Sequence, residues 1–131
     1  MTSFRRAVLS TSVGLLLACS GTTSPVAGTL KVNLTDPNNG QDGAVLLALS
    51  APVPPVSVSA GAGLTLWGGP VATANARLVL TGNVTSGTIL TLQVDDINKF
   101  RQYTVTLQQV AQTSGYQLET SLAGYSVTVT K

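Results

Sequence analysis

Few side chains in this sequence could carry chemistry, and its only thiol, that of Cys19, stands in an unusual place. It closes an apolar run, LLLAC, and a polar stretch rich in Gly, Ser and Thr follows. The chain has no histidine, so a serine nucleophile would lack its commonest activating base. Asp95 and Asp96 are adjacent and would point to opposite faces of an extended segment, whereas paired acid–base work needs two convergent carboxyl groups. We therefore expect a protein that is not an enzyme and that uses no cofactor.

One loop resembles an oxygen-ligand site for calcium. Asp36, Asn38 and Asp42 fall within the turn-rich segment DPNNGQDG. An EF-hand loop would need Gly at its sixth position and a bidentate Glu at its twelfth, where this chain has Gln41 and Leu47. A hairpin loop held by Asx turns accounts for the same residues. We expect no bound metal, and calcium at Asp36, Asn38 and Asp42 is the alternative.

Trp67 is the best candidate for contact with a ligand. It shares strand parity with Thr65, opposite Leu64 and Leu66, so it faces outward if the leucines face the core. An exposed indole can stack on a sugar ring or anchor a protein partner. The chain can instead bend at the following glycines so that the indole packs against the end of the domain, and we predict this partly buried position for Trp67.

The three tyrosines follow a different pattern. Tyr103, Tyr116 and Tyr125 each share parity with apolar neighbours along their segments. We therefore expect all three in the core or at its edge.

The N-terminal segment has the order of charges and apolar residues of a secretory signal peptide. Arg5 and Arg6 precede an uncharged run over residues 7–18 that ends on a small residue. This run is too short to span a bilayer core, which needs about 20 residues. A core helix is the alternative, but Ser10-Thr11-Ser12 interrupts any amphipathic stripe. We predict a signal peptide, with a helical apolar part, over residues 1–18.

The residues around the cysteine resemble the lipobox of bacterial lipoproteins. Leu16, Leu17, Ala18 and Cys19 match its four positions, although Leu17 is larger than is usual there. The resemblance implies that Cys19 receives a diacylglyceryl group and becomes the mature N-terminus, attached to a bacterial membrane. The predicted location is therefore the cell envelope, at the outer membrane if the host is Gram-negative. General secretion is the expected route, and the arginine pair leaves twin-arginine export as the alternative.

The charge of the chain argues against nucleic acid as a partner. The chain has 7 basic and 5 acidic residues and a net charge of +2, but Arg5 and Arg6 belong to the predicted leader. Without them the charges balance, and no basic patch remains for nucleic acid or for anionic lipid. The expected contact with the membrane is the lipid on Cys19.

Short alternating segments fill the rest of the chain. We predict a flexible tether over 19–28 and one domain over 29–131. Turn signals separate apolar segments every 8–12 residues or so, which predicts an all-β antiparallel sandwich of eight or nine strands. The expected strands are 29–34, 44–49, 56–59, 64–67, 77–81, 88–94, 101–110 and 125–130, with a further short alternation at Tyr116 and Leu118.

Two parts of this pattern resemble cohesin-like sandwich domains. Residues 83–94 are similar to a late strand of that family, and residues 43–49 with 56–58 are similar to its early strands. The closing Tyr-Ser-Val-Thr-Val segment is also similar to the end of short uncharacterised lipoproteins. Together these features predict a membrane-anchored envelope lipoprotein that acts as a non-enzymatic interaction or structural module. The alternative is an envelope carbohydrate-binding module that uses Trp67. Its partner would be an envelope protein or a glycan.

Overall fold

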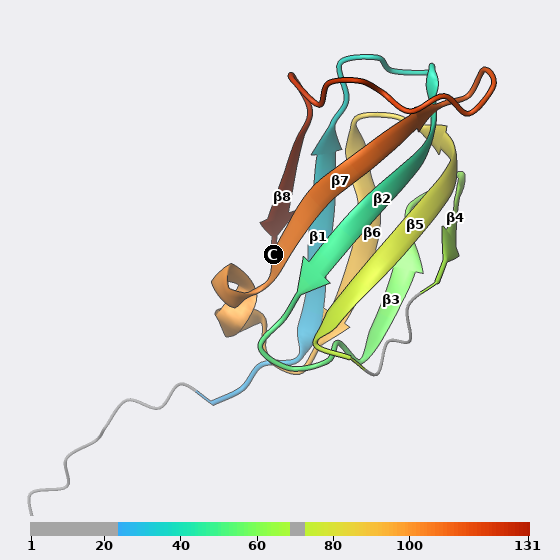
Figure 1. Cartoon of the computed structure of the whole chain (residues 1–131). Coiled ribbons are helices and arrows are strands. Elements are labelled where there is room, and N and C mark those ends of the chain that lie inside the picture. The colour runs from blue at the N-terminus through green and yellow to red at the C-terminus, as the bar shows by residue number, and fades with distance from the viewer. Residues whose placement is uncertain (1–23, 69–72) are drawn as a thin grey trace, which may run out of the picture.

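The computed structural model describes residues 24–68 and 73–131, which fold as two packed antiparallel sheets (Figure 1). The first sheet has the strand order β3-β6-β1-β8, and the second has the order β4-β5-β2-β7. The strands are β1 (Gly28–Thr35), β2 (Asp42–Ser50), β3 (Ser57–Ala60), β4 (Leu64–Trp67), β5 (Asn75–Val84), β6 (Gly87–Val94), β7 (Thr104–Gln112) and β8 (Ser126–Thr130). The predicted all-β sandwich is confirmed.

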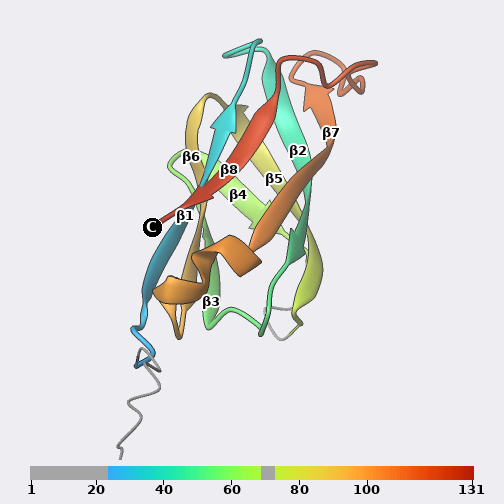
Figure 2. The same cartoon turned by 90° about the vertical axis from the view of Figure 1, so that its left-hand side faces the viewer.

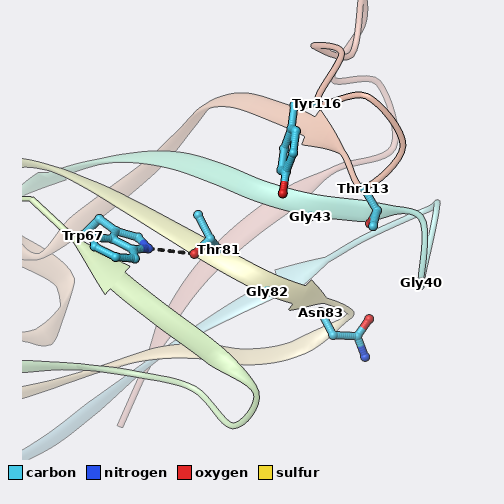
Figure 3. Close-up of a pocket in the computed structure, with 8 residues that line it drawn as sticks. All are labelled: Gly40, Gly43, Trp67, Thr81, Gly82, Asn83, Thr113 and Tyr116. Atoms are coloured by element: carbon cyan, nitrogen blue, oxygen red, sulfur yellow. Dashed lines mark hydrogen bonds between the residues drawn. The ribbon is translucent and has the colours of Figure 1, made fainter.

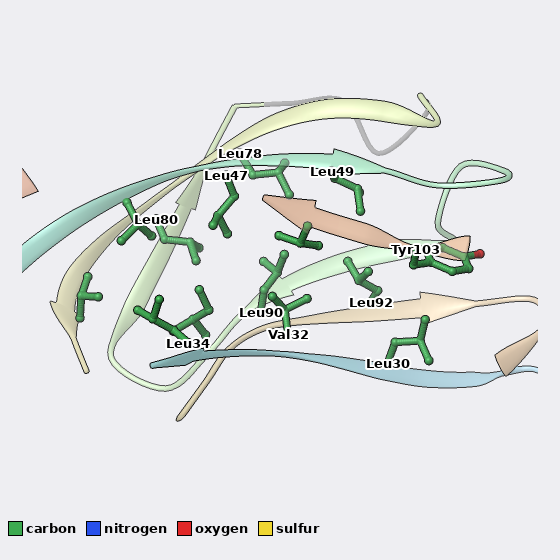
Figure 4. Packing of buried hydrophobic residues seen from close by; sticks show 14 of the residues in the cluster. Leu30, Val32, Leu34, Leu47, Leu49, Leu78, Leu80, Leu90, Leu92 and Tyr103 are labelled. Carbon is green, nitrogen blue, oxygen red and sulfur yellow. The ribbon is translucent and has the colours of Figure 1, made fainter. Parts of the chain in front are cut away.

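The core lies between the two sheets and comes from the alternating apolar positions of their strands (Figure 4). Each central strand sends every second side chain inward, which is the period-two pattern of a strand with one buried face. The fully or almost fully buried side chains include Leu30, Val32 and Leu34 of β1, Val45, Leu47 and Leu49 of β2, Leu78 and Leu80 of β5, and Leu90, Leu92 and Val94 of β6.

The chain crosses from the first sheet to the second through a short 3-10 helix, η1 (Ile97–Gln102), which precedes β7 (Figure 2). The sequence pattern predicted a turn here and a strand from residue 101, so the expected start of that strand is wrong. The carboxylate of Asp96 accepts a hydrogen bond from the Asn98 backbone N–H at 3.0 Å and caps the helix. The helix that this bond caps includes Arg101 and Gln102, the first two residues of the predicted strand, so they do not pair in the sheet. Tyr103 follows the helix and is buried, as expected.

The outer faces of the two sheets differ in chemistry. Hydroxyl and amide side chains cover the β3-β6-β1-β8 sheet and bond to one another, as in the hydrogen bond from Thr88 Oγ1 to Asn33 Oδ1 at 2.8 Å. On the β4-β5-β2-β7 sheet, Leu46 and Val79 stand opposite each other in the pairing of β2 with β5 and are half-buried. Because the sequence 44–49 is apolar throughout, we expected this strand to be central or covered on both faces. It is central, and no strand or helix among the described residues covers its outer side.

Candidate functional site

A charge-free groove lies on the outer side of the β4-β5-β2-β7 sheet, at the end where β5 finishes and β2 begins (Figure 3). Its volume is about 600 Å³. Glycines form much of its lining, and aromatic, hydroxyl and amide side chains complete it. The lining residues are Gly40, Gly43, Trp67, Thr81, Gly82, Asn83, Thr113 and Tyr116.

Trp67 forms one side of this groove and is 58% exposed. Its indole lies alongside β5, and its Nε1–H donates to Thr81 Oγ1 at 2.7 Å (Figure 3). The parity argument is confirmed, since Leu64 and Leu66 pack against the core while Trp67 faces outward. The predicted position of the indole, partly buried against the end of the sandwich, is wrong. The hydrogen bond holds the ring in one orientation and leaves much of its surface open to a ligand.

Tyr116 contributes the second aromatic ring, and it is 74% exposed. The prediction that this tyrosine belongs to the core or its edge is wrong. Tyr125 is half-buried and packs against the core, in agreement with the same prediction.

A small hairpin after β7 explains the position of Tyr116. The backbone N–H of Gln112 donates to the Gln117 carbonyl at 2.8 Å, and Ala111 forms an isolated bridge with Leu118. Tyr116 ends the turn between them with a φ of 52°, a left-handed conformation that is uncommon for a bulky residue. The predicted strand at 116–118 is therefore a single bridge. The turn residues Thr-Ser-Gly before Tyr116 are the signal that could have placed the tyrosine at a hairpin tip.

The groove presents stacking faces and neutral hydrogen-bonding groups together. Trp67 and Tyr116 offer ring faces, and Thr81, Thr113 and Asn83 offer hydroxyl and amide groups. None of the lining residues is charged, a thiol or a serine. This combination suits a neutral ligand with both C–H faces and hydroxyl groups.

An apolar hollow of about 180 Å³ continues along the same sheet face. Leu46, Val79, Ala111 and Leu118 are among its lining residues, and Leu118 is 56% exposed. This hollow lies where the continuous apolar sequence of β2 meets the hairpin after β7. Its chemistry suits an apolar side chain of a partner.

The calcium candidate residues lie where β1 is joined to β2: Asp36 and Asn38 are in the loop, and Asp42 is the first residue of β2. The carboxylate of Asp36 accepts a hydrogen bond from the Asn38 backbone N–H at 2.7 Å, which is the expected Asx turn. Asn38 turns its amide nitrogen inward, where Nδ2 donates to the Tyr125 hydroxyl at 3.0 Å. Within residues 24–68 and 73–131, no group of three or more His, Cys, Asp or Glu side chains could hold a metal ion.

Two further sequence expectations concern the membrane. Cys19 and the whole predicted leader lie outside the described residues, so lipidation of Cys19 stays a prediction. Among the residues that the structure describes, no helix has the length and apolar character needed to cross a bilayer.

Comparison of the chain with models of protein families, with curated proteins and with solved structures finds no match. The likeness to cohesin-like domains and to short lipoproteins therefore rests on the sequence patterns alone.

Proposed function

We infer that this protein is a non-enzymatic binding module of the bacterial cell envelope and that its groove binds a neutral carbohydrate chain. The membrane attachment in this proposal comes from the lipobox resemblance at Cys19. The binding activity comes from the groove. One observation supports it above all: Trp67 and Tyr116, both well exposed, line the same charge-free groove.

Sugar rings have apolar C–H faces and a rim of hydroxyl groups, so aromatic rings and short polar side chains recognise them together. The hydrogen bond from Trp67 to Thr81 holds one ring in place, which lowers the entropy lost on binding. The absence of charge on the lining residues favours neutral over acidic sugars. The lining also lacks a paired base and nucleophile, which supports binding rather than catalysis.

The test is binding of the full chain to a panel of neutral oligosaccharides. Trp67→Ala and Tyr116→Ala should each weaken binding about tenfold, which corresponds to about 1.4 kcal/mol. Val56→Ala is the matched control, because Val56 is 63% exposed and does not line the groove. Retention of full affinity by both aromatic variants would exclude the groove as the binding site.

A protein partner is the second candidate, and the apolar hollow beside the groove favours it. A partner side chain could fill the space between Leu46, Val79 and Leu118. Leu118→Ser separates the two functions, since Leu118 lines the hollow and not the groove. Loss of an envelope protein from co-purification with this variant, with oligosaccharide binding unchanged, would assign the hollow to a protein.

A further inference from the structure

Two buried carboxyl groups interact where β1 is joined to β2: Asp36 follows the last residue of β1, and Asp42 is the first residue of β2. Asp36 is 3% exposed and Asp42 is fully buried. One oxygen of each carboxyl group, Oδ2 of Asp36 and Oδ1 of Asp42, is buried without a hydrogen-bond partner. A buried polar atom without a partner is costly, and a buried charge without one is costlier.

The other oxygen of each group is satisfied. Asp36 Oδ1 accepts from the Asn38 backbone N–H, and Asp42 Oδ2 accepts from the Tyr125 hydroxyl at 2.5 Å. Burial and the hydrogen bond to Asp42 raise the pKa of Tyr125, so its hydroxyl stays protonated and acts as the donor. These bonds fix both carboxyl groups and leave the two unsatisfied oxygens as the open positions.

A single proton would satisfy both of these oxygens at once. Two ionised carboxylates can only repel each other, whereas a protonated Asp42 can donate from Oδ1 to Oδ2 of Asp36. A calcium ion would need six to eight oxygen ligands, roughly, and these two groups supply few of them. We propose that Asp36 and Asp42 share one proton in the folded protein and that this O–H···O bond holds the β1–β2 loop closed.

The other groups that face the pair agree with this assignment. The titratable side chains around Asp42 are Asp36 in the adjoining loop, Tyr125 just before β8, and Glu119 after β7, and none of these side chains can carry a positive charge. Burial is the largest influence and raises the pKa of Asp42, and the neighbouring Asp36 raises it further. The Tyr125 hydroxyl, which donates to Asp42, and the nearby Glu119 act in the opposite direction without reversing the shift.

The proton gives the loop a defined pH dependence. The pKa of Asp42 in the folded protein is above its ordinary value of 3.8. The shared proton therefore contributes its full stabilisation of the folded state when the pH is below 3.8. This stabilisation is lost as the pH rises through the raised pKa. Gly40 of this loop and Gly43 of β2 line the groove, so the segment that contains the pair forms part of one of its walls.

Asp42→Asn in the full chain tests the proposal. The amide Nδ2 of asparagine can donate to Asp36 Oδ2 at any pH, and its Oδ1 can still accept from Tyr125. We expect the denaturant midpoint of this variant to match that of the native chain at about pH 4 and to exceed it increasingly towards about pH 8. Asp36→Asn should act in the same way, and Asp42→Ala should lower the midpoint at every pH because it also removes the Tyr125 acceptor.

Three results would overturn the proposal. The first is that both Asp42→Asn and Asp36→Asn have a lower denaturant midpoint than the native chain, by the same amount at every pH. The second is a ¹³C carboxyl titration of the native chain in which the pKa of Asp42 is not above its ordinary value, because a proton shared with Asp36 delays the ionisation of Asp42. The third is a rise in the native midpoint on addition of CaCl₂ that Asp42→Asn abolishes, which would assign the pair to a cation.

Discussion

Truncation of Trp67 to alanine tests how the indole is held on the face of the sheet. The side chain is 58% exposed, so less than half of its surface is covered by the protein. Complete burial of a tryptophan makes its truncation cost about 3–5 kcal/mol, and the covered fraction reduces this to about 1–2 kcal/mol. The hydrogen bond to Thr81 lies at an exposed position, so it contributes at the lower end of the usual range, about 0.5 kcal/mol.

The assay is denaturant unfolding of Trp67→Ala and of the native chain. The chain has 1 tryptophan, so the substitution removes the fluorescence signal, and far-ultraviolet circular dichroism must follow unfolding in both proteins. Thr81→Val is the matched control, since it removes the acceptor of the indole N–H and keeps the ring. A loss above about 3 kcal/mol for Trp67→Ala would refute the exposed position, and a loss below about 0.5 kcal/mol would refute the packing of the ring on β5.

Three further predictions concern the anchor, the domain and one close backbone contact. Cys19→Ala should leave the precursor unlipidated and uncut before residue 19, and an acylated, processed product by mass spectrometry would contradict the lipobox assignment. Residues 29–131 expressed alone should give the circular dichroism spectrum of a β protein without any oxidant, whereas a helical spectrum would contradict the predicted domain. Gly82→Ala should be less stable than Gly87→Ala by about 1–3 kcal/mol. Both glycines have positive φ angles, 133° and 129°, but a Cβ at Gly82 would overlap the carbonyl oxygen of Gly63, and one at Gly87 would meet no atom within 4 Å. Equal stability of these two variants by thermal unfolding would show that the backbones at Gly82 and Gly63 are not in close contact.

The fold could be predicted from the sequence because strand periodicity and turn residues indicate the same strand boundaries almost everywhere. Leu30, Val32 and Leu34 alternate with polar residues, and the structure buries all three. The prediction failed where a local hydrogen bond decides the backbone conformation. At residues 97–102 the Asp96 cap favours a short helix over the start of a strand, and alternation of residue types carries no sign of that choice.

The candidate site was predictable only in part. The outward direction of Trp67 follows from its parity with Thr65. The groove itself depends on Tyr116, which reaches the same sheet face from a hairpin distant in sequence. Its apolar neighbours suggested burial, but the hairpin turn places its side chain outside the core. The partners of Asp36 and Asp42 were also hidden, because the spacing of acidic residues in a loop does not reveal that Asn38 bonds to Asp36 and Tyr125 to Asp42.

The most direct measurement of the central claim is a titration of the full chain with neutral oligosaccharides, followed by tryptophan fluorescence. Trp67 is the chain's sole tryptophan, so any change in emission reports on the groove. We predict a saturable shift of the emission with at least one neutral oligosaccharide and its loss in Tyr116→Ala. An emission spectrum that no neutral oligosaccharide changes, from a protein that circular dichroism shows to be folded, would contradict the assignment of the groove to carbohydrate.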